Sequence, residues 1–366
     1  MDSMKLEDCC EILDSQRVPI TGSDRTSGDY PYYGANGIQD YVDDFIFDDE
    51  LVLLAEDGGN FGSKTRPIAY RVSGKCWVNN HAHVLKPKAG LDVDYLCYPL
   101  MFYDVGGMVN GATRQKLTQA AMRQMIIPKR SLDEQIEIVN IIKKVQGVIA
   151  SRKEELEQLD LLIKARFVEL FGDININDKN WKYEPLGELC TIVRGGSPRP
   201  IEQFLGGDVP WIKIGDATDG DSIYLNSTKE HIIQEGIKKS RLVKEGSLIF
   251  ANCGVSLGFA RIITFDGCIH DGWLAMEDID ERLDKVFLLQ ALNQMTEHFR
   301  AIAPAGTQPN LNTAIMKAYK QVIPPIELQR EFINFAKQVT KSKVAVQKAL
   351  DETQILFDSL MQEYFG

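Results

Sequence analysis

The residues that could do chemistry in this sequence form short motifs, and two of them depart from the pattern that their chemistry requires. Residues 58–65 read GGNFGSKT after an apolar run, but Ser63 stands where a phosphate-binding loop needs the glycine before its lysine. Residues 254–258 read GVSLG, as a hydrolase nucleophile turn would, but FARIITF follows and reads as a strand rather than the required helix. We therefore expect a glycine-rich hairpin here and no nucleotide site.

His81 and His83 form an HxH pair, and on a strand both side chains would point to one face, as metal ligands could. No third ligand stands nearby, so a structural or nucleic-acid-facing role is the better interpretation. HExxH, GxGxxG and the FxGxG and (N/D)PP(Y/F) motifs of adenine methyltransferases do not occur, and no nuclease carboxylate cluster is evident. We expect no catalytic residue, no metal and no cofactor.

These motifs lie in a chain that repeats itself. Several segments match in the same order at offsets of about 180 to 196 residues, which is the signature of a tandem duplication. The pairs are KLEDCCEILDS (from 5) with PLGELCTIVRG (from 185), DYPYYGANG (29) with DVPWIKIGD (208), ELVLLAEDGGNFG (50) with GSLIFANCGVSLG (246), TRQKL (113) with TQPNL (307), IIP with VIP, and the Phe-Gly that ends each half.

Each half closes with a long amphipathic segment. Ser131 followed by Glu134 predicts a capping box at the start of the first helix. Apolar residues then follow the 3.5-residue period of a coiled-coil seam, interrupted by Arg152 and Arg166, and the second helix keeps the same phase 194 residues later. The seam residues are Ile138, Ile142, Val145, Ile149, Leu156, Leu159, Ile163 and Leu170, then Phe332, Ala336, Val339, Leu350, Phe357 and Tyr364. We expect an antiparallel pair; two helices packed separately on their own domains are the alternative.

The remaining segments predict compact, β-rich mixed domains. Residues 49–55, 68–72, 247–251 and 260–264 are expected strands between glycine turns, and 93–102 and 283–301 are expected helices. Residues 173–181 are polar and form the expected linker. The fold class is α+β, a pseudo-twofold tandem repeat of two mixed domains separated by two long helices that form an antiparallel coiled coil.

The charge distribution is uneven along the 366 residues. The net charge is −11, yet residues 58–90, 105–132 and 299–326 contain no acid, which favours anion-facing surfaces on an acidic protein. Chance combined with strand-face alternation is the alternative. No secretion signal or membrane-length apolar run is present, and the seven cysteines include no CxxC, so we expect a cytoplasmic protein with reduced thiols.

The chain resembles the specificity (S) subunits of Type I restriction–modification systems over essentially its full length. The resemblance is carried by KLEDCCEI, PLGELCTI, LLAEDGG, VNNHAHVLKP and the DYPYYGANG and DVPWIKIGD turns. The most specific features are IPKRSLDEQIEI and IPPIELQREFI at the helix starts, together with the tandem order.

The resemblance implies a non-catalytic subunit that recognises a bipartite, asymmetric site in double-stranded DNA. Its helices would dock two methyltransferase (M) subunits, and a restriction/translocase (R) subunit would complete the nuclease. It implies target-recognition domains at residues 1–130 and 173–325 and long helices at 131–172 and 326–366. A coiled-coil protein-interaction scaffold without DNA reading is the alternative, and a hydrolase using Ser256 is a third reading.

The candidate DNA-contacting residues follow from chemistry rather than from the resemblance. Phosphate contacts favour Lys and Arg, above all in acid-free segments, and base contacts favour Arg, Asn and Gln on loops and helix starts. The phosphate candidates are Lys64, Arg66, Arg71, Arg114, Lys116, Arg123, Arg194, Arg199, Lys238, Lys239, Arg241 and Lys317, with Arg17 as a further candidate. The base-reading candidates are Asn60, Asn110, Gln115, Gln308, Asn310 and Asn312.

Overall fold

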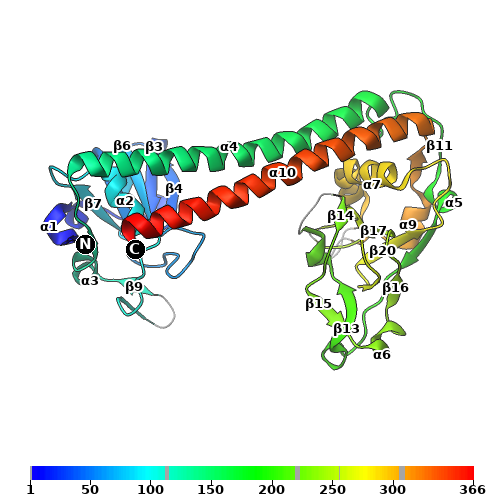
Figure 1. The fold of residues 1–366 in the computed structure, drawn as a ribbon, viewed down its shortest axis with the longest axis horizontal. Coiled ribbons are helices and arrows are strands. Elements are labelled where there is room, and N and C mark those ends of the chain that lie inside the picture. The colour runs from blue at the N-terminus through cyan, green and yellow to red at the C-terminus, as the bar shows by residue number, and fades with distance from the viewer. Residues whose placement is uncertain (1, 112–114, 219–222, 255, 305–309) are drawn as a thin grey trace. The chain divides into compact units, whose positions relative to one another are not determined.

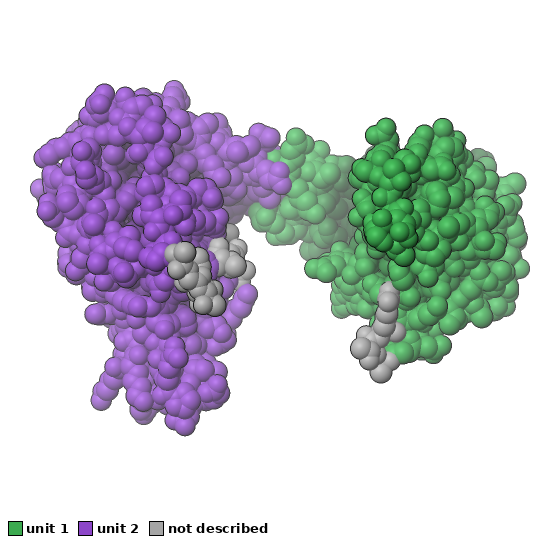
Figure 2. Space-filling model, turned by 180° about the vertical axis from the view of Figure 1, so that it is seen from behind, with its two compact units in different colours: residues 1–154, 347–366 green, residues 155–346 purple. Residues whose placement is uncertain are grey.

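The computed structural model describes residues 2–111, 115–218, 223–254, 256–304 and 310–366 (Figure 1). The contacts between residues divide the chain into two compact units, shown in Figure 2. Unit 1 comprises residues 1–154 and 347–366, and unit 2 comprises residues 155–346. None of the described helices is both long and apolar enough to cross a membrane.

Unit 1 is built on a six-stranded sheet in the order β2-β7-β5-β6-β3-β4. Its strands are β2 (Cys10–Ile12), β3 (Ser27–Gly34), β4 (Gly37–Val42), β5 (Phe47–Ala55), β6 (Ala69–Val78) and β7 (Ala82–Pro87). The last five residues of β5 are fully buried, and Leu51 to Leu54 alternate between two apolar clusters, because successive side chains of a strand point to opposite faces. Helix α2 (Val93–Met101) packs against β5 and β6.

Short elements complete unit 1. The ladder of β1 (Ser3–Lys5) and β10 (Ile126–Pro128) leads into the first long helix. The others are α1 (Leu6–Cys9), β8 (Val109–Asn110), β9 (Lys116–Leu117), α3 (Gln119–Arg123) and two 3-10 turns, Asp14–Gln16 and Gly22–Asp24.

Unit 2 contains a five-stranded sheet in the order β12-β20-β17-β18-β14 and a second, four-stranded sheet in the order β15-β13-β19-β16. The strands are β12 (Thr191–Arg194), β13 (Leu205–Ile212), β14 (Tyr224–Leu225), β15 (Glu230–Ile232), β16 (Arg241–Val243), β17 (Leu248–Ala251), β18 (Ala260–Ile263), β19 (Gly267–Ile269) and β20 (Trp273–Glu277). The ladder of β11 (Tyr183–Pro185) and β21 (Lys320–Val322) leads into the second long helix. The helices are α5 (Leu186–Leu189), α6 (Gln234–Ile237), α7 (Lys285–Gln294), α8 (Thr296–Ile302) and α9 (Thr313–Ala318), with 3-10 turns Ile201–Gln203 and Ile214–Thr218.

The predicted tandem repeat is present in the strand pairing. In unit 1 Ile12 pairs with Leu85 and Leu85 with Val52; in unit 2 Ile192 pairs with Met276 and Met276 with Leu248. The order β2-β7-β5-β6 is thereby matched by β12-β20-β17-β18. The sequence repeat is therefore a repeat of topology.

The expected strands and the first expected helix are confirmed, with ends that differ from the expected ones by at most six residues. The helix expected over 283–301, however, is two helices. The first, α7, ends at Gln294 with Met295 as its C-cap, and α8 begins at Thr296. The Thr296 hydroxyl donates to the carbonyls of Asn293 (2.8 Å) and Gly258 (3.1 Å). A threonine side chain that bonds the backbone in this way competes with the helical hydrogen-bond ladder.

The long helices are α4 (Leu132–Phe171) and α10 (Ile326–Phe365). The predicted capping box is confirmed, since the Ser131 backbone N–H donates to Glu134 (2.8 Å) and the Glu134 N–H donates to the Ser131 hydroxyl (3.4 Å). Every seam residue named above is buried or half-buried. Within unit 2, Asp160 pairs with Lys343 and Arg166 with Glu331, both at 2.6 Å, so residue numbers fall along α4 as they rise along α10. This part of the helix pair is antiparallel, as predicted.

Candidate nucleic-acid interface

The end of β5 is the point where separate connections of unit 1 meet. The Glu56 N–H donates to the His81 carbonyl (2.9 Å), and the Leu117 N–H donates to the Glu56 carbonyl (2.7 Å). An isolated β-bridge joins Asp57 to Lys116. The backbone of one residue, Glu56, thus holds the β6–β7 turn and the β8–β9 connection against β5.

A further connection joins the same place. The Asn36 amide, in the β3–β4 turn, donates to the Gly58 carbonyl (3.0 Å). We call the described residues of these four connections, 35–36, 56–68, 79–81, 109–111 and 115–117, the first loop cluster. It contains Asn60, Lys64, Arg66, Asn110, Gln115 and Lys116 from the predicted set, all exposed or half-buried.

One acidic segment of unit 1 lies away from the first loop cluster, which itself contains the acids Glu56 and Asp57. Asp48, Asp49 and Glu50 are at the start of β5, six to eight residues before Glu56. At about 3.3 Å per residue this places them roughly 20–26 Å away along the strand. The first loop cluster is therefore separated from this acidic segment, as an anion-binding surface on an acidic protein requires.

A buried polar network supports the first loop cluster from below. The His83 ring is fully buried, with Nδ1 2.6 Å from Asp14 and Nε2 2.9 Å from the Leu117 carbonyl. Asp14 also accepts from the Gln119 amide (2.8 Å) and the Val84 N–H (2.9 Å). The interpretation of the HxH motif as structural is supported for His83, because both ring nitrogens face acceptors within the protein.

Glu56 is the second carboxylate of this network. Its oxygens lie 2.6 Å from Arg17 and 2.9 Å from Lys116. Burial alone would raise the pKa of Glu56, but the hydrogen bonds from Lys116 and Arg17 hold it below its ordinary value. Burial alone would also raise the pKa of Asp14, but the hydrogen bond and the charge of His83 outweigh that effect and lower the pKa. Although Asp14, Glu56 and His83 are close enough to share a metal ion, Arg17 and Lys116 already neutralise them.

The same backbone frame recurs in unit 2. The Asn252 N–H donates to the Gly272 carbonyl (2.9 Å), the Leu311 N–H donates to the Asn252 carbonyl (2.8 Å), and a β-bridge joins Cys253 to Asn310. Asn252 therefore occupies the place of Glu56, and Asn310 that of Lys116. We call residues 194–200, 238–241, 252–254, 256–259, 270–272 and 310–312 the second loop cluster.

The second loop cluster gathers predicted cations around Asp271. The Arg194 Nε donates to the Asp271 carbonyl (3.1 Å), and the Arg199 guanidinium lies 3.5 Å from its carboxylate. Ser240 donates to the Gly196 carbonyl (2.7 Å), which brings the segment carrying Lys238, Lys239 and Arg241 beside the arginine loop. All five cations are exposed. Burial lowers the pKa of neighbouring His270, against the effect of Asp271.

Other predicted residues lie elsewhere or already have partners. Arg17 is only 12% exposed in its side chain and contacts Glu56 and Asp14. Arg71, on β6, pairs with Glu50 and with Asp94 (3.4 Å). The side chain of Asn312 accepts from the Ile315 N–H (2.9 Å) and caps α9.

Arg123 and Lys317 occupy equivalent last turns of α3 and α9, which pack against α1 and α5 rather than within the loop clusters. Arg114 and Gln308 lie outside the described residues.

The sequence reasoning missed two glutamines that hold each domain to its long helix. The Gln135 amide accepts from the Asp92 N–H (2.8 Å) and donates to the Gly90 and Arg130 carbonyls (both 3.0 Å). Gln329 makes the equivalent bonds to Asp284, Arg282 and Pro324 at 2.7–2.9 Å. Their signal was present in the sequence, because they are 194 residues apart at the same helix position.

The motif that resembled a hydrolase turn is a hairpin. Strands β17 and β18 pair antiparallel on either side of it, and the Gly258 N–H donates to the Ala251 carbonyl (2.9 Å). Ser256 is 1% exposed. The expectation of a hairpin in place of a nucleophile turn is confirmed.

Comparisons with known proteins agree with this architecture. The family model for the Type I restriction modification DNA specificity domain matches residues 1–161 and 178–353. A putative type I restriction enzyme specificity subunit of Haemophilus influenzae is 30% identical over 342 residues, covering 90% of this chain and 85% of that protein. A type I restriction enzyme specificity subunit of Methanocaldococcus jannaschii is 22% identical over 324 residues, covering 81% of this chain and 74% of the relative.

Solved structures show the same fold. The S subunit of the Type I restriction-modification system of M. genitalium has a TM-score of 0.59 at 15% identity, with 100% of this chain and 96% of that chain covered. A chain from a structure on complex assembly and conformational transition of the type I R-M system has a TM-score of 0.61 at 16% identity, covering 99% and 97%. On its duplicated topology and these matches, the chain belongs to the Type I restriction modification DNA specificity family.

Proposed function

We propose that this chain is the non-catalytic DNA sequence-specificity subunit of a Type I restriction–modification complex and that each loop cluster reads one half of a bipartite, asymmetric site. The observation that supports this most directly is the duplicated frame at the ends of β5 and β17. The two frames have the same backbone bonds but different side chains, Glu56 and Lys116 in one, Asn252 and Asn310 in the other. Because the backbone frame is the same but its side chains differ, the two copies are suited to recognise two different half-sites.

The exposed cations of the loop clusters are the proposed phosphate contacts. Lys64 and Arg66 serve in the first cluster, and Arg194, Arg199, Lys238, Lys239 and Arg241 serve in the second, because phosphate contacts draw on exposed Lys and Arg side chains. Asn60, Asn110 and Gln115 are proposed base contacts. Arg17 supports the loops in this proposal, since its guanidinium already contacts Glu56, Asp14 and the Ala82 carbonyl.

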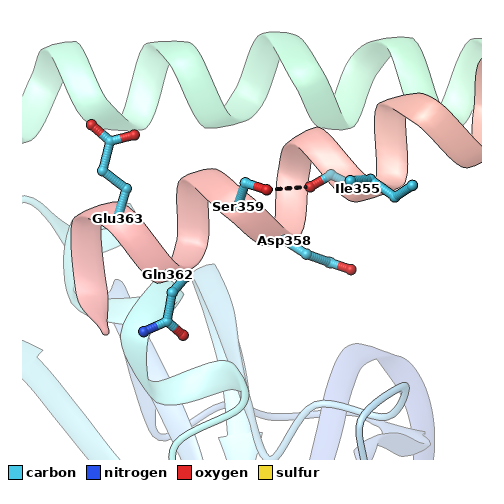
Figure 3. A pocket seen from close by; sticks show the side chains of 5 residues that line it. All are labelled: Ile355, Asp358, Ser359, Gln362 and Glu363. Atoms are coloured by element: carbon cyan, nitrogen blue, oxygen red, sulfur yellow. Dashed lines mark hydrogen bonds between the residues drawn. The ribbon is translucent and has the colours of Figure 1, made fainter.

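The long helices are the proposed docking elements for two methyltransferase subunits, with a restriction/translocase subunit joining the complex. Large apolar side chains on both helices remain exposed, among them Leu161 (54%), Val344 (65%) and Ile355 (65%). Ile355 borders a shallow hollow on α10 together with Asp358, Ser359, Gln362 and Glu363 (Figure 3). The proposed boundaries are residues 1–130 and 173–325 for the target domains and 131–172 and 326–366 for the helices.

The test is methylome sequencing of cells that express this chain with a Type I methyltransferase subunit encoded beside it. The proposal expects methylation confined to one asymmetric motif with two different halves. Methylation without sequence preference would refute the proposal. If no methyltransferase co-purified and the chain had no affinity for DNA at low salt, the coiled-coil scaffold would be the better account.

A further inference from the structure

We propose, on the basis of the DNA-reading function above, that Lys116 and Asn310 are equivalent base-reading residues. Each is positioned by the side chain just beyond the neighbouring strand, Glu56 in unit 1 and Asn252 in unit 2. Each pair joins two connections that are otherwise far apart in the sequence.

The environment of Lys116 favours a base over a phosphate. Its side chain is 49% exposed, yet its Nζ lies 2.9 Å from Glu56, whose carboxylate is only 12% exposed and also contacts Arg17. A fixed carboxylate beside the ammonium cancels much of its attraction for a phosphate anion. The same carboxylate restricts the lysine rotamers, which reduces the entropy lost on contact with a neutral base edge.

Asn310 has the corresponding arrangement without charge. Its Oδ1 accepts from the Asn252 amide (3.1 Å), and that amide also donates to the Leu311 carbonyl (3.1 Å). Asn252 is fully buried, so it anchors Asn310 from below. An amide oxygen has two lone pairs, so Asn310 keeps acceptor capacity beside its N–H donors.

The chemistry of the two residues assigns different bases to them. Lysine offers only donors, which match the O6 and N7 acceptors of guanine in the major groove. Asparagine offers a donor and an acceptor, which match N7 and N6 of adenine. We therefore assign a guanine contact to Lys116 and an adenine contact to Asn310.

The experiment compares methylation by the full chain in complex with its methyltransferase on duplexes in which each base pair of the site is varied singly. Lys116→Met and Asn310→Ala should each lose about tenfold or more in discrimination at one base pair, a guanine for Lys116 and an adenine for Asn310. The matched controls are Lys129→Met, exposed on the loop before α4, and Asn226→Ala, exposed just after β14 and outside the second loop cluster. Both controls should keep the wild-type preference at every position.

The positioning role of Glu56 has its own readout. Glu56→Gln should relax the same single base pair as Lys116→Met, and the double variant should lose no more than Lys116→Met alone, because the two residues act as one unit. A merely structural role would instead relax the whole half-site, and the two losses would add.

The possible outcomes distinguish failure of the two base assignments from failure of the proposed DNA-specificity function. A wild-type complex without sequence preference would refute the proposed function itself. A selective wild-type complex whose Lys116→Met and Asn310→Ala variants keep the full motif would overturn the inference alone. A uniform loss of affinity for all sequences would also overturn it, because that pattern identifies phosphate contacts.

Discussion

Asp14 shows how one side chain ties distant segments of unit 1 together. It lies beyond β2, and its buried carboxylate bonds His83 on β7 and Gln119 on α3. A buried carboxylate is stable only when its charge is neutralised and its lone pairs are satisfied. The equivalent position in unit 2 carries Arg194, which is exposed, so this solution belongs to unit 1 alone.

The first prediction concerns pH. The pKa values of Asp14 and Glu56 lie below their ordinary values of 3.8 and 4.5, so the unfolded chain binds more protons. Their stabilisation is therefore present above those ordinary values and lost as the pH falls through the folded values. Asp14→Asn should cost roughly 3 kcal/mol of unfolding free energy near neutral pH and much less in acid. Denaturant unfolding of the wild type and the variant at neutral and at acid pH measures this difference in unfolding free energy.

The control for the pH prediction is Asp48→Asn, an exposed position at the start of β5. It should change stability by less than about 0.5 kcal/mol at either pH. An equal loss for Asp14→Asn at both pH values would contradict the assigned role of its charge.

The second prediction concerns the paired glutamines. Gln135 is 1% exposed and Gln329 is fully buried, and each satisfies one N–H and two carbonyls. Replacement by alanine leaves those buried groups unpaired, so Gln135→Ala and Gln329→Ala should each cost about 2 kcal/mol or more. The exposed Gln158→Ala should stay within about 0.5 kcal/mol in the same thermal or denaturant unfolding. Equal unfolding free energies of all three variants would disprove the role of Gln135 and Gln329 in holding each domain to its long helix.

At the scale of elements, each long helix ends in a phenylalanine that packs against a shorter helix, α7 for α4 and α2 for α10. Phe171, at the end of α4, packs against Phe287 of α7 with ring centroids 4.8 Å apart. Phe365, at the end of α10, packs against Tyr95 of α2 at 5.3 Å. The Phe-Gly pairs that end the two sequence halves are therefore equivalent packing contacts.

The third prediction uses the different burial of these two rings. Phe171 is fully buried and also contacts Phe167 and Phe332, so Phe171→Ala should cost about 3–5 kcal/mol. Phe365 is half-buried, so Phe365→Ala should cost clearly less, about 1–2 kcal/mol. Val168→Ala, half exposed on α4, is the control. Unfolding free energies in the reverse order would contradict the described packing.

At the scale of the whole molecule, the net charge of −11 coexists with two surfaces that would have to approach a polyanion. The structure reconciles these facts for unit 1 by placing Asp48, Asp49 and Glu50 at the start of β5 and the candidate cations beyond its end, where Glu56 is paired with Arg17 and Lys116. Local charge, rather than total charge, then governs association with DNA.

The fourth prediction follows for salt dependence. In complex with the methyltransferase, the logarithm of DNA affinity should fall with the logarithm of salt, and Lys64→Gln or Arg199→Gln should each reduce the slope by about 0.9. Sequence preference should not change, because phosphate contacts carry no base information. Lys348→Gln, 78% exposed on α10, should leave the slope unchanged. If Lys64→Gln and Arg199→Gln kept the wild-type salt slope, Lys64 and Arg199 would not be phosphate contacts.

Much of the fold could be predicted because the signals are local and periodic. The capping box at Ser131, the seam phase of α4 and α10 and the strands at β5 and β17 depend on neighbours within a few residues. The division of residues 283–301 could not be predicted in this way, because Thr296 bonds a residue 38 positions away. The candidate site was predictable only as a set of residue types on loops.

The sequence by itself determined that the chain is a duplication, that each half ends in a long seam helix and that the common catalytic motifs are incomplete, because order, period and spacing are readable without a fold. Only the tertiary structure decided which residues meet. It placed Arg17 in a partly buried ion pair, made Asn312 a helix cap and joined Lys116 to Glu56 and Asn310 to Asn252. These contacts link positions about 40 to 60 residues apart or are set by a local turn, so strand pairing rather than the pattern of residues brings them together.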